Sequence, residues 1–236
     1  MTVIVHDDRA TLVERTADRL ATLLGELIAS QGRATVAVTG GSVGIALLAE
    51  LADREIEWQR VRITWSDERY VASDSPDRNA VQAREALLDR VPIPAENIRE
   101  LPADDGTPLA DAAAAGTALL RELGPIDLTL LGMGPDAHIA SLFPGHAGVH
   151  EAGVAVIGVT DSPKPPPERL SFTVDAINAS DRVWLVIAGA DKAPAVALAR
   201  SGASAADAPA GTAHGRHETL MLLDAEAAAL LEEGGR

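Results

Sequence analysis

Two hydrophobic patterns alternate along the chain. Short, continuously apolar runs predict strands that are buried on both faces of a sheet. Between most of these runs, apolar residues recur every three or four positions, as in a helix with one buried face. The predicted strands occupy residues 3–5, 35–39, 61–65, 128–131, 154–159, 170–173, 183–187 and 219–223, with a further short strand near 98–101. The predicted helices occupy residues 9–30, 79–88, 109–123 and 193–199, and one more follows the turn at 40–44 and ends near residue 52.

This alternation favours an α/β fold with a doubly wound, mostly parallel sheet and helices on both faces, as in Rossmann-like proteins. The sequence contains no internal repeat and no linker, so we expect a single domain over residues 1–236. A polar loop is predicted at 66–76, and small residues predict a flexible stretch at 202–215. Asp224 is placed to cap a closing helix that runs to Leu231.

The amino-acid composition excludes some kinds of site and disfavours some kinds of partner. The chain has no cysteine, which excludes disulfides, thiolate metal ligands and a cysteine nucleophile. Its net charge of −15 argues against general binding to nucleic acid or anionic membranes. The first residues lack the features of a secretory signal, and no apolar run approaches the ~20 residues of a membrane span. We expect a cytoplasmic protein that is a monomer or a weak homodimer.

A glycine-rich turn, Thr39-Gly40-Gly41-Ser42-Val43-Gly44, joins a predicted strand to a predicted helix. Glycines expose backbone N–H groups, and the helix N-terminus adds partial positive charge, so this turn can bind an anion. The same residues match G-x-S-x-G, the nucleophile elbow of α/β-hydrolases, which would make Ser42 a nucleophile. Too few residues precede the motif for the usual strands, and no HGGG-like oxyanion loop lies upstream. We therefore expect Gly40, Gly41 and Ser42 to bind a phosphate.

The segment that follows strand 128–131 carries the candidate catalytic residues. Gly132-x-Gly134 leads into Asp136-Ala137-His138. Side chains at the carboxyl end of a buried strand lie where open α/β sheets bind ligands, and an imidazole there can move protons near neutral pH. The alternative is a structural histidine that donates to a backbone carbonyl. Alanine at position 137 fits a negative φ, whereas a left-handed turn would strain it.

Cationic side chains follow other strands. Arg69, together with Asp67, comes directly after strand 61–65 on the same sheet edge as the glycine turn, and its guanidinium can grip a phosphate with two donors. Prolines stiffen the loop that carries Lys164 and Arg169, and two interpretations of it remain open: a rigid loop that places a cation over the pocket, or a plain extended connector. Lys192 follows strand 183–187, and it is one of only two lysines in the chain.

We predict no metal site. His146 and His150 have the i, i+4 spacing of helical metal ligands, but Gly145 and Gly148 argue against a helix there.

Together these segments resemble the family of 6-phosphogluconolactonases and glucosamine-6-phosphate isomerases/deaminases. The block 128–145 closely resembles the lactonase signature, although members usually have D-G-H where this chain has Ala137. Asp67-Glu68-Arg69 is the D-E-R form of the lactonases, whereas the isomerases have D-E-Y and use an aspartate as base. In the isomerases an N-E-P stretch supplies a glutamate that works with the histidine, but residues 141–144 contain no acid.

The resemblance implies hydrolysis of 6-phospho-D-glucono-1,5-lactone to 6-phospho-D-gluconate, the second step of the oxidative pentose phosphate pathway, without a metal or organic cofactor. His138 would be the general base that activates water, and Asp136 would orient it or bind sugar hydroxyls. The residues expected to contact the substrate or its phosphate are Gly40, Gly41, Ser42, Asp67, Arg69, Lys164, Arg169 and Lys192. Two alternatives remain: an isomerase or deaminase of amino-sugar phosphates, and a non-catalytic sugar-phosphate sensor.

Overall fold

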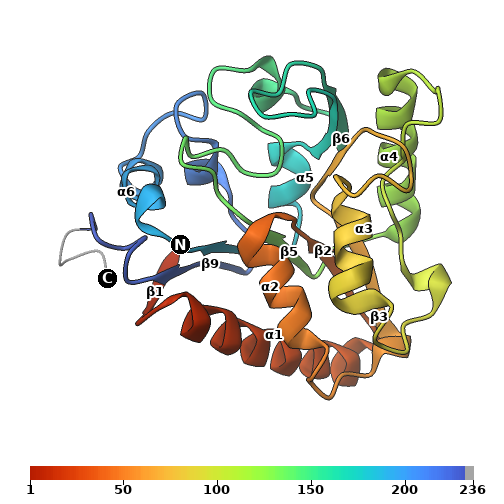
Figure 1. Ribbon diagram of the computed structural model, residues 1–236, viewed down its shortest axis with the longest axis horizontal. Helices are drawn as coiled ribbons and strands as arrows, with labels where there is room; N and C mark the ends of the chain where they lie inside the picture. Colours follow the sequence, from red (N-terminus) through yellow and green to blue (C-terminus); the bar gives the residue numbers. More distant parts are fainter. Residues whose placement is uncertain (232–236) are drawn as a thin grey trace.

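A six-stranded sheet forms the centre of the molecule. The computed structural model describes residues 1–231, and the strands of this sheet are parallel in the order β1-β9-β8-β5-β2-β3. They are β1 (Thr2–His6), β2 (Ala34–Val38), β3 (Val61–Trp65), β5 (Leu128–Leu131), β8 (Arg182–Ile187) and β9 (Glu218–Asp224). The predicted doubly wound, mostly parallel sheet is therefore confirmed (Figure 1).

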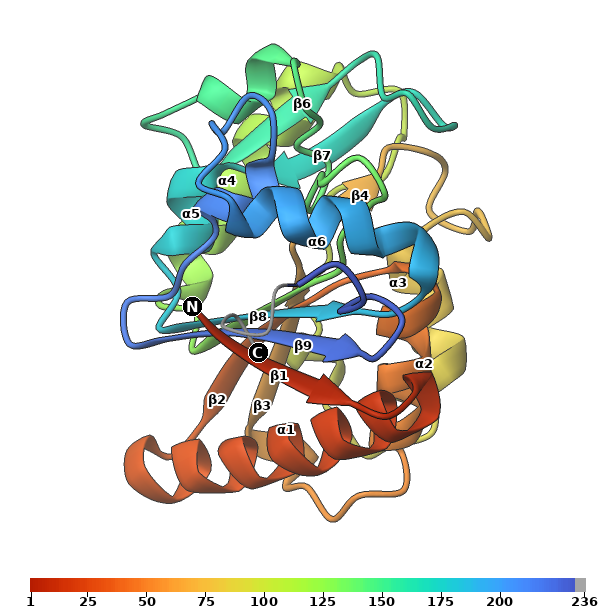
Figure 2. The ribbon, with the colours of Figure 1, turned by 90° about the vertical axis from the view of Figure 1, so that its left-hand side faces the viewer.

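Helices cover both faces of this sheet, as Figure 2 shows. One face packs against α1 (Arg9–Gln31), α2 (Gly41–Leu51) and α3 (Asn79–Ala83), and the other against α4 (Leu109–Leu123), α5 (Val174–Asn178) and α6 (Ala193–Arg200). Successive side chains of a strand point to opposite faces. Leu128 and Leu130 of β5 accordingly pack in the core on the α1 face and Leu131 in the core on the α4 face, so leucines of this strand are buried on both faces of the sheet.

A second, three-stranded antiparallel sheet was not predicted. Its order is β4-β7-β6, with β4 (Asp67–Arg69), β6 (Val156–Val159) and β7 (Arg169–Phe172). The prediction of a plain polar loop over 66–76 is wrong at its start, because Asp67–Arg69 pairs with β7. Polar residues form a strand here because the partner strand, far along the chain, supplies the hydrogen bonds.

Other predicted elements are altered. Near 98–101 a single bridge joins Ile98 to Ile63, without a strand. The helix predicted over 79–88 changes after Ala83 into a π-helical turn, Arg84–Leu88. The stretch 202–215 includes a 3-10 turn, Pro209–Thr212, and buried alanines. Further 3-10 turns occupy Trp58–Arg60, Ala95–Asn97, Ala147–His150 and Ala190–Lys192.

The closing helix predicted after Asp224 is wrong, since residues 225–230 form turns. The Asp224 carboxylate does accept from the Ala227 N–H at 2.8 Å, as a helix cap would. It also accepts from the Gly189 N–H at 3.0 Å, so its role is to join two segments of the chain. No helix within residues 1–231 is long and apolar enough to cross a membrane.

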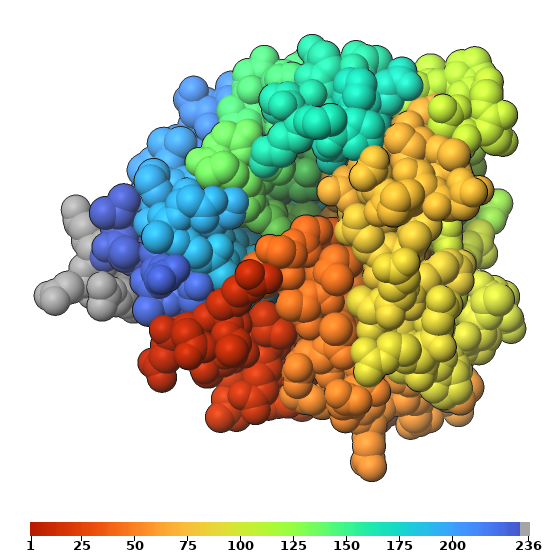
Figure 3. Space-filling model, viewed as in Figure 1, coloured from red at the N-terminus to blue at the C-terminus, as the bar shows by residue number. Residues whose placement is uncertain are grey.

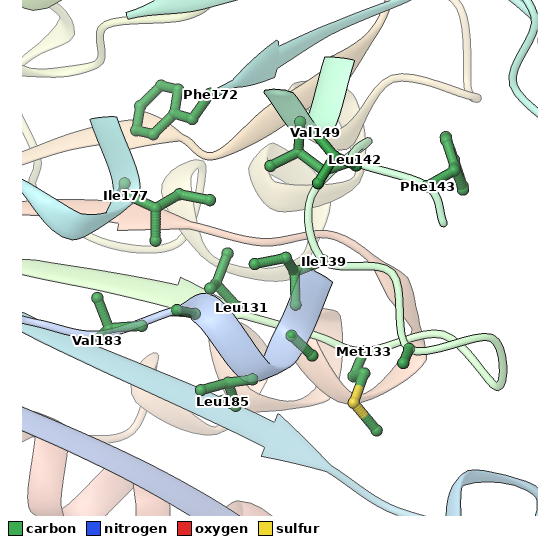
Figure 4. Packing of buried hydrophobic residues seen from close by; sticks show 14 of the residues in the cluster. Leu131, Met133, Ile139, Leu142, Phe143, Val149, Phe172, Ile177, Val183 and Leu185 are labelled. Carbon is green, nitrogen blue, oxygen red and sulfur yellow. The ribbon is translucent and has the colours of Figure 1, made fainter. Parts of the chain in front are cut away.

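The loop after β5 is anchored in the core between the two sheets (Figure 4). Ile139, Leu142 and Phe143 are almost completely buried and belong to the same hydrophobic cluster as Leu131 of the main sheet and Phe172 of β7. Figure 4 shows Ile139 next to Leu131. Burying each such side chain contributes roughly 1.5–3 kcal/mol. This packing fixes the loop immediately after His138.

Candidate active site

The carboxyl ends of β2, β5 and β8 border a cavity of about 340 Å³. In Figure 3 the surface is hollowed where the orange segment that begins α2 meets green and teal segments. Open parallel sheets bind ligands at this edge, because the strand ends and the helix N-termini meet there. The predicted site residues that line the cavity are Gly40, Gly41, Ser42, Asp67, Arg69, His138, Lys164, Arg169 and Lys192. Asp136 is not in the lining, but it contacts His138.

The glycine turn brings the first turn of α2 to the cavity wall. Gly41 has a φ of +79°, which favours glycine. At Gly40 a Cβ would lie 2.0 Å from Oδ1 of Asn79, so only glycine lets the turn approach that side chain. The first N–H groups of a helix have no intrahelical acceptor, and they carry the positive end of its dipole. An anion in the cavity can therefore accept from the backbone of α2.

His138 and Asp136 form a hydrogen-bonded pair, with Nδ1 and Oδ1 2.5 Å apart. Burial opposes ionisation of Asp136, but the hydrogen bond and the charge of His138 lower its pKa to about 2. The carboxylate is thus an acceptor, so Nδ1 carries the proton and Nε2 is the nitrogen left to accept one. This hydrogen bond is the contact that the first of the two predicted roles of Asp136, orienting His138, would need.

The backbone around this pair is unusual. Ala137 has a φ of +66° and Ala140 a φ of +48°, so the strained alternative for Ala137 is the one that the structure shows. A left-handed conformation costs an alanine roughly 1–2 kcal/mol. At Gly134 a Cβ would lie 2.0 Å from Nδ1 of His138 and 2.3 Å from Oδ1 of Asp136, so a side chain there is incompatible with the pair. The His138 ring also packs against Phe143, with centroids 4.7 Å apart.

Arg69 is held by several partners. Its Nη1 donates to the Asn79 side chain at 2.5 Å and to the backbone carbonyl of Asp77 at 2.9 Å. Asn79 in turn donates to the backbone carbonyl of Asp67 at 2.9 Å. The Asp67 carboxylate accepts from the Ser141 hydroxyl at 2.8 Å, which links β4 to the loop that carries His138.

Glu68 was not among the predicted site residues, although it joins two segments that form the site. Its carboxylate is buried and accepts from the N–H groups of Arg69, Asn79 and Ala80 at 2.7–2.9 Å, with the buried Arg78 guanidinium 3.6 Å away. Burial raises the pKa of Glu68, while Arg78 and the three N–H groups act to lower it. Glu68 thereby ties β4 to the start of α3. The D-E-R sequence contains this residue, but nothing in the sequence indicates that it is buried.

The remaining cations approach from two further segments. Lys192 precedes α6, and its ammonium lies 3.0 Å from the Asp191 carboxylate. Lys164 lies in an exposed part of its loop, and the desolvation of its ammonium lowers its pKa, with Asp136 opposing that effect and Lys192 adding to it. A chain with a net charge of −15 thus places four cationic side chains, including Arg69 and Arg169, around one cavity. Such a site favours an anionic ligand.

Within residues 1–231, no three or more histidine or acidic side chains are grouped to hold a metal ion. His146 lies 3.6 Å from the Asp161 carboxylate, and its ring packs against Phe143.

Known proteins resemble this chain over nearly its whole length. The sequence model described as glucosamine-6-phosphate isomerases/6-phosphogluconolactonase matches residues 7–222. A 6-phosphogluconolactonase from Streptomyces coelicolor is 45% identical over 97% of this chain and 94% of its own length. One from Mycobacterium leprae is 45% identical over 96% of this chain and 97% of its own length.

Among solved structures, 6-phosphogluconolactonase from Thermotoga maritima has a TM-score of 0.86 at 26% identity, covering 94% of this chain and 99% of that one. The likeness therefore extends over almost the whole fold. The chain belongs to the family of glucosamine-6-phosphate isomerases and 6-phosphogluconolactonases.

Proposed function

We propose that this chain hydrolyses 6-phospho-D-glucono-1,5-lactone to 6-phospho-D-gluconate, with His138 as the general base. The observation that carries the proposal is the Asp136–His138 pair beside a cavity lined by cations. Relatives at 45% identity that carry the name 6-phosphogluconolactonase support it. The substrate is a dianion with an activated ester, so the site has to bind the phosphate and assist the attack of water.

The chemical step follows from the orientation of His138. Nε2 takes a proton from a water molecule while the water oxygen attacks the lactone carbonyl carbon, and the carbonyl becomes an oxyanion. Collapse of this intermediate breaks the bond to the ring oxygen, which receives the proton from the imidazolium. The open-chain carboxylic acid that results then loses its remaining proton to solvent and becomes the carboxylate product. Asp136 stabilises the imidazolium between the two proton transfers, and base catalysis of this kind is worth ~10²–10⁴ in rate.

The phosphate is bound, in this proposal, by the N–H groups at the start of α2, by Arg69 and by Lys192. Ser42 adds a hydroxyl, while Asp67, the one acidic side chain in the described lining, is available to sugar hydroxyls. Because the phosphate is remote from the carbonyl, its binding energy can hold the reacting atoms in place. The enzyme acts in the cytoplasm as a monomer or weak homodimer, and the charge of −15 disfavours a nucleic-acid partner.

The isomerase alternative needs the glutamate that an N-E-P stretch supplies after the histidine, in addition to any acid before it. Residues 139–144 contain none, and Ser141 of this segment instead donates to Asp67. A direct comparison of freshly generated lactone and glucosamine 6-phosphate as substrates tests the choice. We expect acceleration of lactone hydrolysis alone. Turnover of the amino sugar would favour the isomerase or deaminase, and binding without any turnover would favour a sensor.

A further inference from the structure

Arg169, the first residue of β7, is buried although it lines the cavity. Only 6% of it is exposed. Its Nε donates to the carbonyl of Pro166 at 3.2 Å, and its Nη2 donates to those of Lys164 at 2.9 Å and Pro165 at 3.3 Å. One edge of the guanidinium is therefore occupied by three consecutive carbonyls of the proline-rich loop, and these hydrogen bonds are called the Arg169 clamp below.

This loop has few donors of its own. Pro163 and the prolines at 165–167 have no N–H groups, so they cannot donate to the carbonyls around them. Ser162 donates its hydroxyl to the Lys164 carbonyl at 2.9 Å, and its N–H reaches the Pro167 carbonyl at 3.1 Å. The carbonyls of Pro165 and Pro166 have Arg169 as their donor. The position of Lys164 therefore depends on Arg169.

Two features of the Arg169 environment destabilise the fold, so we expect this arginine to have a role that a neutral residue could not fill. Arg169 stands directly opposite Arg69 in the register of β4 and β7, and like charges in this position repel. Burial lowers the pKa of Arg169, with Asp67 opposing the effect and Arg69 adding to it. A neutral residue would avoid both costs, but it could not donate to three carbonyls from one planar group.

Lys164 is the residue that gains from this contact. Its ammonium and the Asp136 carboxylate carry opposite charges, and each charge favours ionisation of the other group. Lys164 lines the same cavity as His138. We propose that Arg169 is a positioning residue that fixes the Lys164 backbone and so aims the Lys164 ammonium at the anionic substrate beside His138. The identity of that substrate rests on the proposed function.

A double-mutant cycle tests this role, with the affinity for 6-phosphogluconate measured by calorimetry. If Arg169 acts through Lys164, Arg169→Gln and Lys164→Ala should each weaken binding by ~10-fold, the scale of one charge-assisted hydrogen bond. The double variant should bind no more weakly than Lys164→Ala, because coupled residues are not additive. Arg169→Lys should behave like Arg169→Gln, since an ammonium cannot replace the planar donor set. Arg99→Gln, which removes an exposed arginine paired with Glu122, is the matched control.

Three results would overturn the proposal. Multiplicative losses in the double variant would mean that Arg169 contacts the ligand itself. Full affinity in Arg169→Lys would mean that only its charge matters. Unchanged affinity in Arg169→Gln would remove Arg169 from the site altogether. Should Arg169→Gln fail to fold, the cycle is run with Arg169→Lys.

A second readout needs no ligand and no turnover. Hydrogen exchange at the amides of Ser162 and Lys164 should accelerate at least severalfold in Arg169→Gln and Arg169→Lys, but not in Lys164→Ala, which keeps the clamp. Equal exchange in all variants would contradict the proposal. Absence of lactone hydrolysis by the wild type would instead refute the proposed function, while the exchange result would still decide whether the clamp exists.

Discussion

At the residue scale, the chemistry depends on one proton and where it resides. Asp136 accepts from Nδ1 of His138, so the opposite nitrogen is free to act as a base. The pKa of Asp136 is about 2, below its ordinary value, so the carboxylate supports the pair at all higher pH. This support is lost only as the pH falls through the lowered pKa. Asp136 therefore contributes no step to the pH–rate profile near neutrality.

Asp136→Asn should lower kcat by ~10²-fold or more, because an amide can donate to Nδ1 and leave the proton on Nε2. KM should change little, since Asp136 is outside the cavity lining. The kcat, the KM and their pH dependence are measured for both forms. Far-ultraviolet circular dichroism is the control for folding. A variant with wild-type kcat would exclude Asp136 as the orienting group.

Ser42 distinguishes base catalysis from nucleophilic catalysis. It is exposed in the first turn of α2, and His138 has Asp136, rather than Ser42, as its hydrogen-bond partner. Ser42→Ala should therefore raise KM a few-fold, by loss of one hydrogen bond of ~1 kcal/mol, and leave kcat nearly unchanged. Loss of kcat to the level of a His138 variant, or an acyl-enzyme detected by mass spectrometry, would instead establish Ser42 as the nucleophile of an α/β-hydrolase elbow.

At the scale of elements, the loop after β5 has to be both tight and glycine-rich. Gly134 lets the chain pass directly against the His138–Asp136 pair, and the buried residues at 139, 142 and 143 hold the far side. The sequence motif indicates that a turn is needed. It does not indicate which atom the missing side chain would meet, because that contact arises only when the loop is folded.

Gly134→Ala should separate His138 from Asp136, since the added Cβ lies 2.0 Å from Nδ1. Its kcat should fall about as far as that of Asp136→Asn. Gly132→Ala is the matched control, because its Cβ would meet only Thr39 Oγ1, at 3.9 Å. The nitrogen chemical shifts of His138 report the pairing directly. An intact pair in Gly134→Ala would show that the loop adjusts more readily than its packing suggests.

Elements whose interactions are local were the ones that could be predicted. Helix α1 and strand β5 follow from their own apolar spacing. Strand β4 could not be predicted, since Asp67–Arg69 becomes a strand only by pairing with β7. The turns after Asp224 show the opposite error, a predicted helix that does not form. The cap residue is present, but its carboxylate also accepts from the Gly189 N–H and no helix follows.

At the scale of the whole molecule, the parallel sheet assembles the site. Segments that begin at 39, 132 and 188 are far apart in sequence but leave neighbouring strands at one edge. That rule was sufficient to predict that the glycine turn, Arg69, His138 and Lys192 share a pocket. The buried Glu68–Arg78 contact and the clamp made by Arg169 could not be predicted, because both depend on the second sheet.

In the proposed function, His138 is the general base that lets a phosphate-binding cavity hydrolyse the lactone. Wild type and His138→Ala are compared on freshly generated 6-phosphogluconolactone, with the spontaneous rate subtracted, and the affinity of each for 6-phosphogluconate is measured alongside. We predict that the wild type accelerates hydrolysis, that His138→Ala loses ~10²–10⁴-fold in kcat, and that affinity is largely retained. Turnover by His138→Ala near the wild-type rate, or a wild type that does not accelerate hydrolysis, would contradict this proposal.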